Sequence, residues 1–357
     1  MTFGERLKQA RTRSGLTQEA LARQVSVEKM SISTYESGKM MPSSSTLIAL
    51  SKALAVDVEF FFREFSVTMQ SRPHFREVRG GKLSVSEKKQ IVAETEEALS
   101  RQHEVFAICE YSMPKPDAEL RRYASNMQDV DALAEEVRKA WDLGLDPIDN
   151  LMETAESHGF SIVLVDGAKD FDAAVFLDEP SGPVISIKAG VSRERQRFTL
   201  AHELGHYFVL DRGADSATWN EETRANRFAA SFLVPRKMLV SDVGEHRTSL
   251  DVRELNLLRE KYGVSIEMLL FRLYSAGIIS QKLMKDYVSK ARLGLLNDAS
   301  ERKFSEEPRV VKRLVYRAVA EGVISEQKGF ELLGESGGIS SSPSEAACVC
   351  ILKFCLI

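Results

Sequence analysis

The residues with the clearest chemical spacing are two histidines four positions apart, His202 and His206, with Glu203 directly after the first. On a helix these histidines share one face, so both imidazoles can reach one ion at about 2.0–2.1 Å. Glu203 points toward the open side of that ion, where it can take a proton from water and later pass it to a leaving amine. Apolar residues on both sides of the motif indicate a buried helix with one polar stripe. The alternative is two histidines on an apolar helix without metal.

A catalytic zinc also needs a third protein ligand and an open fourth position. The acidic residues downstream are Asp211, Asp215, Glu221 and Glu222. We favour Glu222, because it starts a predicted helix and Asn226 follows one turn later on the same face. The Asn226 side-chain oxygen can then accept a hydrogen bond from the ring nitrogen of His202 that faces away from the ion. The alternatives are that Glu221 is the ligand, or that both glutamates only complement a helix N-terminus.

The sequence around these residues resembles the ImmA/IrrE family of zinc peptidases. The similar stretches are RFTLAHELGH at 197–206, ETRANRFAA at 222–230 and LVP ending at Pro235. Residues 171–188 resemble the strands that precede the zinc helix in that family, and residues 311–333 resemble the helical C-terminus of members fused to a DNA-binding domain. The resemblance implies one Zn²⁺ per chain held by His202, His206 and Glu222, with Glu203 as the general base.

A second set of residues lies near the N-terminus, in the stretches LTQEALA at 16–22 and SISTYESGK at 31–39. These stretches resemble phage-repressor (Xre-type) helix-turn-helix domains, in which the second of two short helices enters the major groove. The side chains expected to face the groove are Lys29, Met30, Ser31 and Thr34. Those expected to contact phosphates are Gln18, Ser37 and Lys39. The alternative is a small helical bundle that serves protein contacts.

The turn between these two helices departs from the usual pattern. Its glycine position is occupied by Ser26, for which a left-handed backbone is unfavourable. Lys29 can pair with guanine and Met30 can contact a thymine methyl group. We therefore expect a DNA-binding domain whose turn carries a small cost in stability.

The elements that position these residues follow from hydrophobic periodicity and from breaks at glycine and proline. We predict a mostly helical α+β protein with a five-helix phage-repressor-type domain, a zincin-like domain with a small β-sheet, and a helical C-terminus. The expected divisions are a helix-turn-helix domain at 1–65, a connector of helical-hairpin character at 66–125, the zinc domain at 126–245, a helical region at 246–335 and a disordered tail at 336–357. The stretch 88–97 has no strong apolar stripe, which favours a connector there.

Composition narrows the class of protein. The net charge of −4 excludes a uniformly basic nucleic-acid coat but leaves room for a local basic face. No apolar run reaches the length of a membrane span and no signal-peptide core is present, which favours the cytoplasm. Three of the four cysteines, Cys348, Cys350 and Cys355, crowd the end of the chain and lack a fourth metal ligand nearby.

These observations predict a transcriptional regulator that binds a double-stranded DNA operator and carries a zinc-dependent endopeptidase-like domain. In one version the domain cuts a protein, either a partner regulator or the chain itself. In another it binds zinc as a sensor without turnover on a repressor, and a third is an antitoxin-like repressor. Retention of Glu203, which hydrolysis needs and zinc binding does not, favours the first. Two-fold operators make a homodimer the expected state, and we expect no membrane partner.

Overall fold

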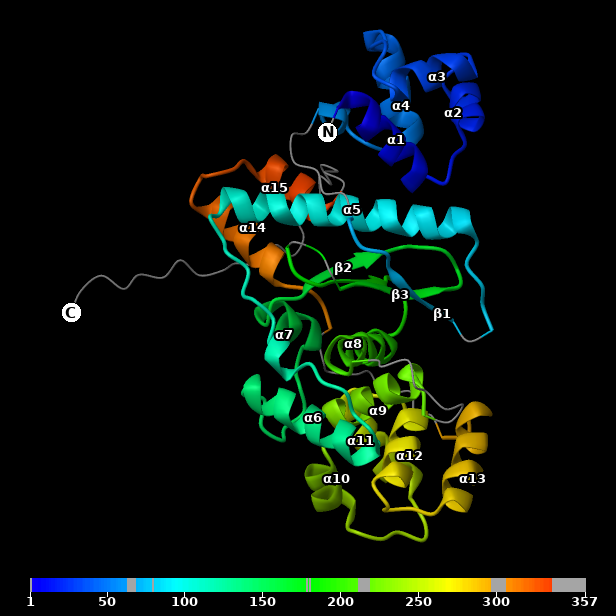
Figure 1. Cartoon of the computed structure of the whole chain (residues 1–357), viewed down its shortest axis with the longest axis vertical. Coiled ribbons are helices and arrows are strands. Elements are labelled where there is room, and N and C mark those ends of the chain that lie inside the picture. Colours follow the sequence, from blue (N-terminus) through cyan, green and yellow to red (C-terminus); the bar gives the residue numbers. More distant parts are fainter. Residues whose placement is uncertain are drawn as a thin grey trace, which may run out of the picture.

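The computed structural model describes residues 2–62, 69–78, 80–177, 179, 181–210, 219–296 and 306–335. Within these ranges the protein is mostly helical and has one small four-stranded sheet, which confirms the predicted fold class (Figure 1). The predicted tail with its three cysteines, and the acids Asp211 and Asp215, lie outside the described residues. No helix in the described part of the chain is long and apolar enough to cross a membrane.

The N-terminal residues form a small helical unit at one end of the molecule (Figure 1). Its elements are α1 (Phe3–Arg13), α2 (Gln18–Gln24), α3 (Lys29–Glu36), α4 (Ser44–Leu54) and the 3-10 helix η1 (Val58–Phe62). The side chains of Thr2, Thr17 and Ser43 accept backbone N–H groups at the starts of α1, α2 and α4, which fixes where these helices begin. Leu21 and Ile32 are fully buried in a core shared by all five elements. The fifth predicted helix is thus a short 3-10 helix.

The sheet has the strand order β1-β3-β4-β2, with β1 (His74–Glu77) and β2 (Ser161–Val165) at its edges. The inner strands are β3 (Phe171–Phe176) and β4 (Val184–Lys188). β1 and β4 each pair antiparallel with β3, whereas β2 and β4 are parallel. Strands β2, β3 and β4 have nearly continuous apolar sequences because helices cover both faces of the sheet (Figure 1).

Within 69–78 and 80–125, the described part of the predicted connector, the chain does not form the helical hairpin that the sequence predicted. These residues contribute the edge strand β1, one long helix α5 (Val85–Ile108) and the short 3-10 helix η2 (Ala118–Leu120). The periodicity of α5 is hard to recognise because several of its buried positions are polar and have partners elsewhere. Thr95 Oγ1 lies 2.7 Å from Ser186 Oγ on β4, and Glu97 pairs with Arg6 of α1. This segment therefore covers one face of the sheet and supports the N-terminal unit.

Helices α7 (Leu151–Ser157) and α8 (Arg193–Phe208) contact the strands on the other side of the sheet, and they belong to a group of helices that share one large core. The other members are α6 (Met127–Ala140), α9 (Glu221–Leu233), α10 (Arg236–Val243), α11 (Val252–Tyr262), α12 (Ile266–Ser275) and α13 (Gln281–Arg292). Their buried apolar residues form a single cluster that runs from Ala124 to Leu296. The domain division predicted at residue 245 therefore does not correspond to a break in the core.

The last two helices return to the opposite side of the molecule (Figure 1). α14 (Val310–Ala320) and α15 (Glu326–Leu333) pack against α5 in a cluster that includes Val105, Val315 and Leu332. The N-terminus of α14 has no side-chain cap of its own. Glu156 of α7 replaces it, because one carboxylate oxygen accepts the backbone N–H groups of Arg309 and Val310 at 2.8 and 3.1 Å. This contact fixes the start of α14 to α7.

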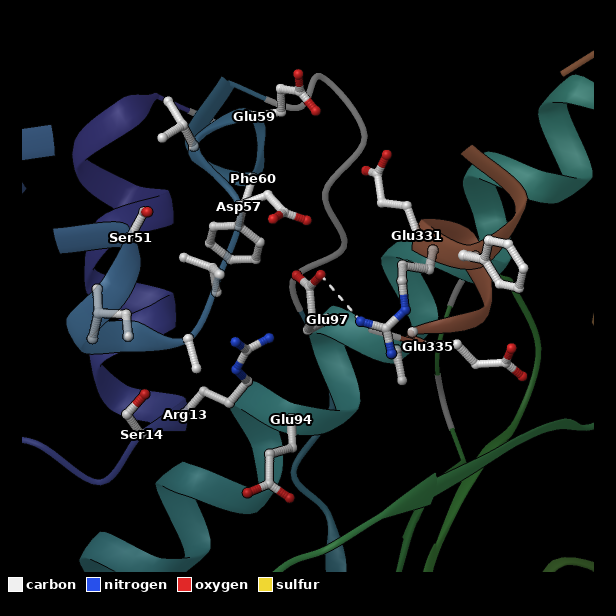
Figure 2. A pocket seen from close by; sticks show the side chains of 18 of the residues that line it. Arg13, Ser14, Ser51, Asp57, Glu59, Phe60, Glu94, Glu97, Glu331 and Glu335 are labelled. Atoms are coloured by element: carbon white, nitrogen blue, oxygen red, sulfur yellow. Dashed lines mark hydrogen bonds and ion pairs between the residues drawn. The ribbon is translucent and has the colours of Figure 1, made fainter. Parts of the chain in front are cut away.

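The N-terminal unit sits on α5 through α1. The guanidinium of Arg6 is fully buried, donates to the backbone oxygen of Phe60 at 3.0 Å and pairs with Glu97 of α5 at 3.1 Å. Beside this contact lies a cleft of about 1440 Å³ whose walls carry many carboxylates (Figure 2). Glu94 and Glu97 approach it from α5 and Glu331 from α15 (Figure 2). Glu97 is also paired with Arg101, at 3.3 Å.

Candidate metal centre and nucleic-acid interface

The candidate metal ligands are carried by two helices, α8 and α9, that approach each other closely. Gly205 lies between the two histidines in the sequence and packs on Ala225 of α9, and a Cβ at Gly205 would lie only 2.9 Å from the Ala225 Cα. Glycine is therefore required at this crossing. α9 begins immediately before Glu222 because the Asn220 side chain accepts the backbone N–H of Thr223 at 2.9 Å.

His202, His206 and Glu222 form a cluster in which one ligand atom from each residue lies within 4.8 Å of the others. The Nε2 atoms of the two histidines are 2.9 Å apart. The Glu222 oxygens lie 3.3 Å from Nε2 of His202 and 3.5 Å from Nε2 of His206. Two imidazoles and one carboxylate are the donor set of a catalytic zinc with an open fourth position. The residues therefore fit the predicted ion, and their roles as ligands stay a prediction.

The ring nitrogens that face away from the cluster each have a partner on α9. The Asn226 Oδ1 atom lies 3.0 Å from Nδ1 of His202, at the position proposed from the sequence. A Glu221 oxygen lies 2.7 Å from Nδ1 of His206. With Nδ1 engaged in this way, both histidines are oriented so that Nε2 is the atom available to an ion.

Sequence reasoning missed the contact of Glu221. We considered this residue only as a ligand or as a charge at a helix N-terminus. In the structure its carboxylate contacts a histidine from the side opposite Glu222. A signal was present, because a carboxylate beside a candidate ligand is a common partner of a metal-binding histidine.

Glu203 lies next to this cluster and is almost completely buried, with 2% of its surface exposed. Its Oε1 atom has no hydrogen-bond partner among the described residues. Burial raises the pKa of Glu203 to about 7, because the charged carboxylate is removed from water. A buried carboxyl group whose pKa is near neutrality can both accept and release a proton.

The two histidines differ in their electrostatic surroundings. Burial lowers the pKa of His202 to about 4. Burial acts in the same direction on His206, but hydrogen bonds to Glu221 and Glu222 outweigh it and raise the pKa of His206 to about 10. Hydrogen bonds from the two histidines hold the pKa of Glu222 well below its usual range. The carboxylates of Glu221 and Glu222 therefore stabilise positive charge at His206, whereas burial disfavours it at His202.

The predicted groove-facing residues lie on α3, which points away from the rest of the molecule (Figure 1). Lys29 and Met30 are exposed, and Met30 has 71% of its surface accessible. Ser31 and Thr34 are partly buried, and the Thr34 hydroxyl donates to the backbone oxygen of Met30 at 2.8 Å. Ser26 has a φ of 56°, so the turn before α3 has the left-handed conformation expected there.

The residues predicted to contact phosphates differ in their exposure to solvent. Ser37 and Lys39 are exposed just after α3. Gln18 is partly buried, and its amide donates to a Glu36 oxygen at 2.7 Å. Arg11 pairs with the same carboxylate at 2.5 Å. This contact orients the Gln18 side chain and uses one of the two N–H donors of its amide nitrogen.

Comparison with known proteins supports both parts of this description. Residues 155–274 match the family model of the IrrE N-terminal-like domain, and residues 2–59 match a helix-turn-helix domain. The chain therefore joins a helix-turn-helix domain to an IrrE N-terminal-like domain, which confirms the two resemblances found in the sequence.

Curated relatives match the N-terminal part. The chain is 43% identical over 61 residues to a transcriptional regulator in the ATPase CF(0) region of Rhodospirillum rubrum, which covers 17% of this chain and 56% of that protein. It is 44% identical over 59 residues to the HTH-type transcriptional activator BcrR of Enterococcus faecalis, which covers 16% of this chain and 29% of that protein. The chain thus spans 56% of the length of the first relative and 29% of the length of the second.

Proposed function

We propose that the protein is a DNA-binding transcriptional regulator whose IrrE N-terminal-like domain is a zinc-dependent endopeptidase. The observation that carries the proposal is the cluster of His202, His206 and Glu222 beside the buried Glu203. Zinc binding alone requires no carboxylate at the position of Glu203. Its burial with one unpartnered oxygen is unfavourable for stability and is explained by a role in proton transfer.

In this proposal, His202, His206 and Glu222 hold the ion, while Asn226 and Glu221 orient the two histidines. A zinc ion held there would act as a Lewis acid and would make water more acidic. Glu203 accepts the proton of the attacking water at a carboxylate oxygen and then gives it to the amine nitrogen that leaves. The surrounding helices exclude bulk water from Glu203, since it is almost completely buried.

For the N-terminal domain, we propose that α3 enters the major groove. Lys29, Met30, Ser31 and Thr34 would contact base edges, and Gln18, Ser37 and Lys39 would contact phosphates. The exposure of Met30 supports this assignment, because a methionine with 71% of its surface accessible has no role in the core. The names of the two relatives, a transcriptional regulator and a transcriptional activator, also support it. A two-fold operator would be bound by a homodimer.

The metal part is tested by elemental analysis of the full chain. We expect about one zinc per chain, lost in His202→Ala. Retention of stoichiometric zinc by His202→Ala would show that the ion binds elsewhere. Glu203→Gln is the matched control, because it removes the proton acceptor without removing a ligand.

Hydrolysis is tested by incubating zinc-loaded protein with the proteome of its own host and with the purified chain itself. New peptide termini should appear with the wild type and fall by about 10²–10⁴-fold in rate with Glu203→Gln. If the wild type and Glu203→Gln give the same termini at the same rate, the domain binds zinc without turnover and is a sensor.

DNA binding is tested by selecting sequences from a random double-stranded pool with the full chain. Lys29→Ala should change the selected sequence, because a base-reading side chain sets preference at one position. Selection of no sequence by the wild type, together with binding that does not depend on the first 62 residues, would contradict the assignment.

A further inference from the structure

A cationic side chain lies against the helix α8 that carries the two histidines, outside the segment that matches the IrrE N-terminal-like domain. Arg76 lies on the edge strand β1, opposite Ala173 of β3. Its Nε atom donates to an Asp172 oxygen at 3.1 Å, and its side chain is 22% exposed. The guanidinium carbon lies 5.9 Å from the ring centre of Phe198 on α8. Arg76 therefore belongs to the face of the sheet that α8 covers.

An irregularity in the sheet creates this arrangement. Arg76 pairs with Ala173 and Glu77 pairs with Phe171, so Asp172 is an extra residue on β3. A bulge of this kind turns a side chain to the other face of the strand. Asp172 consequently contacts α8, where it accepts hydrogen bonds from Arg195 Nε at 2.7 Å and Thr199 Oγ1 at 3.2 Å. Thr199 is one helical turn before Glu203, so the bulge brings the guanidinium of Arg76 toward that carboxylate.

Two buried polar atoms in this region lack partners among the described residues. One is a donor, the Nη1 atom of Arg76, and the other is an acceptor, Oε1 of Glu203. Most buried polar atoms have partners, so each one without a partner calls for an explanation, of which a catalytic role is one. Arg76 and Thr199 contact the same Asp172 oxygen, and Thr199 lies one helical turn before Glu203, so an unpartnered donor and an unpartnered acceptor on this side of α8 can hold a polar group between them.

We propose that Arg76 binds the carbonyl oxygen of the scissile peptide bond by donating its Nη1–H. The inference rests on the proposed peptidase function and adds a catalytic residue to it. The water oxygen forms a bond to the carbonyl carbon, the π electron pair moves to the carbonyl oxygen, and the water proton goes to Glu203. When the carbon–nitrogen bond breaks, the pair on oxygen restores the double bond and Glu203 gives its proton to the amine nitrogen. Arg76 stabilises the negative charge that oxygen carries between these steps.

A purely structural role for Arg76 would be to neutralise Asp172. That carboxylate already has Arg195, whose Nε atom is closer to it than that of Arg76. Arg195 is therefore the matched control: its replacement removes an ion pair with Asp172 but no unpartnered donor from the centre. If neutralisation of Asp172 were the only role, Arg76→Ala and Arg195→Ala would behave alike.

The test measures ligand binding to the zinc-loaded full chain by calorimetry. The probes are a blocked dialanine phosphinate, whose P–O⁻ replaces the charged oxygen of the reacting peptide bond, and acetohydroxamate, a small chelator of the ion. Arg76→Ala should bind the phosphinate about 10²–10³-fold more weakly, the effect of losing one donor to such an oxygen. Acetohydroxamate affinity and zinc content should stay within about 3-fold of the wild type, and Arg195→Ala should leave phosphinate affinity within the same range. Arg76→Gln, which keeps an N–H donor for Asp172, should show the same phosphinate defect if Arg76→Ala does not fold.

The outcomes separate this inference from the function on which it rests. A wild-type protein that binds neither zinc nor acetohydroxamate would overturn the zinc peptidase and Arg76 together. A wild type that binds both, with unchanged phosphinate affinity in Arg76→Ala and Arg76→Gln, would overturn only the role of Arg76. Equal losses in Arg76→Ala and Arg195→Ala would also overturn it, in favour of neutralisation of Asp172.

Discussion

Replacing Asn226 with alanine removes the acceptor that lies 3.0 Å from Nδ1 of His202. The His202 side chain is fully buried but Asn226 is exposed, so the ring N–H loses its protein partner and water can restore only part of that hydrogen bond. A buried donor in this state costs about 1–3 kcal/mol, which corresponds to roughly 5–150-fold in a binding constant. We therefore expect zinc affinity to fall by about 10–100-fold, as is usual when the outer partner of a ligating histidine is lost.

The assay is competition for zinc against a chromophoric chelator, with the full chain at constant pH and ionic strength. Asn226→Asp keeps an acceptor at the same position and should retain zinc at least as tightly as the wild type, because a carboxylate makes the imidazole a better ligand. Glu221→Ala should also weaken zinc binding, because it removes the oxygen that lies 2.7 Å from Nδ1 of His206. Unchanged zinc affinity in a normally folded Asn226→Ala protein would refute the reasoning and leave Asn226 with a packing role alone.

Three further predictions concern DNA binding and stability. Lys39→Ala should weaken binding to all DNA sequences about equally and reduce the slope of log K against log salt by about 1, measured by fluorescence anisotropy; a change in sequence preference would contradict a phosphate contact. Arg6→Met should lower the free energy of unfolding by about 1–3 kcal/mol, because the buried Glu97 carboxylate loses one partner and keeps Arg101. The double variant Arg6→Met/Glu97→Met should lose less than the sum of the single changes, and additive losses in urea titrations would show that the pair is not coupled. Burial raises the pKa of Glu156 to about 7. The folded protein therefore holds the proton of the Glu156 carboxyl group more tightly than the unfolded chain does, and its stability falls by up to about 3 kcal/mol as pH rises from about 4.5 to 7. Glu156→Gln should remove this loss, and parallel stability curves for the two proteins across that range would contradict it.

The parts of the protein that depend on local spacing could be predicted from the sequence. The positions of His202, His206, Glu222 and Asn226 follow from helical periodicity, because each pair on one helix is four residues apart. The close crossing of α8 and α9 then brings the two pairs together. The left-handed turn at Ser26 was also predictable, since its place between two short helices is set by local geometry.

Features that depend on distant partners could not be predicted in this way. β1 is four residues long and becomes a strand only because it pairs with β3, about 97 residues later in the chain. Its short polar sequence carries no alternation that distinguishes it from a loop, so Arg76 had no apparent relation to the metal centre. The packing of α5 was equally hard to predict, because the partners of its buried Thr95 and Glu97 lie on β4 and α1. The environment of Arg76 thus required the tertiary structure.

The long helix α5 touches α1 of the N-terminal unit, strand β2 of the sheet, and both α14 and α15. With 24 residues it is about 36 Å long, and it is the element through which these three parts meet. Thermodynamic linkage gives this arrangement a reciprocal consequence. If a ligand that displaces α5 from the sheet changes the affinity of α1–α4 for DNA by some factor, DNA must change the affinity for that ligand by the same factor. Measuring either change in affinity, for DNA or for the ligand, therefore gives the coupling free energy between the two binding sites.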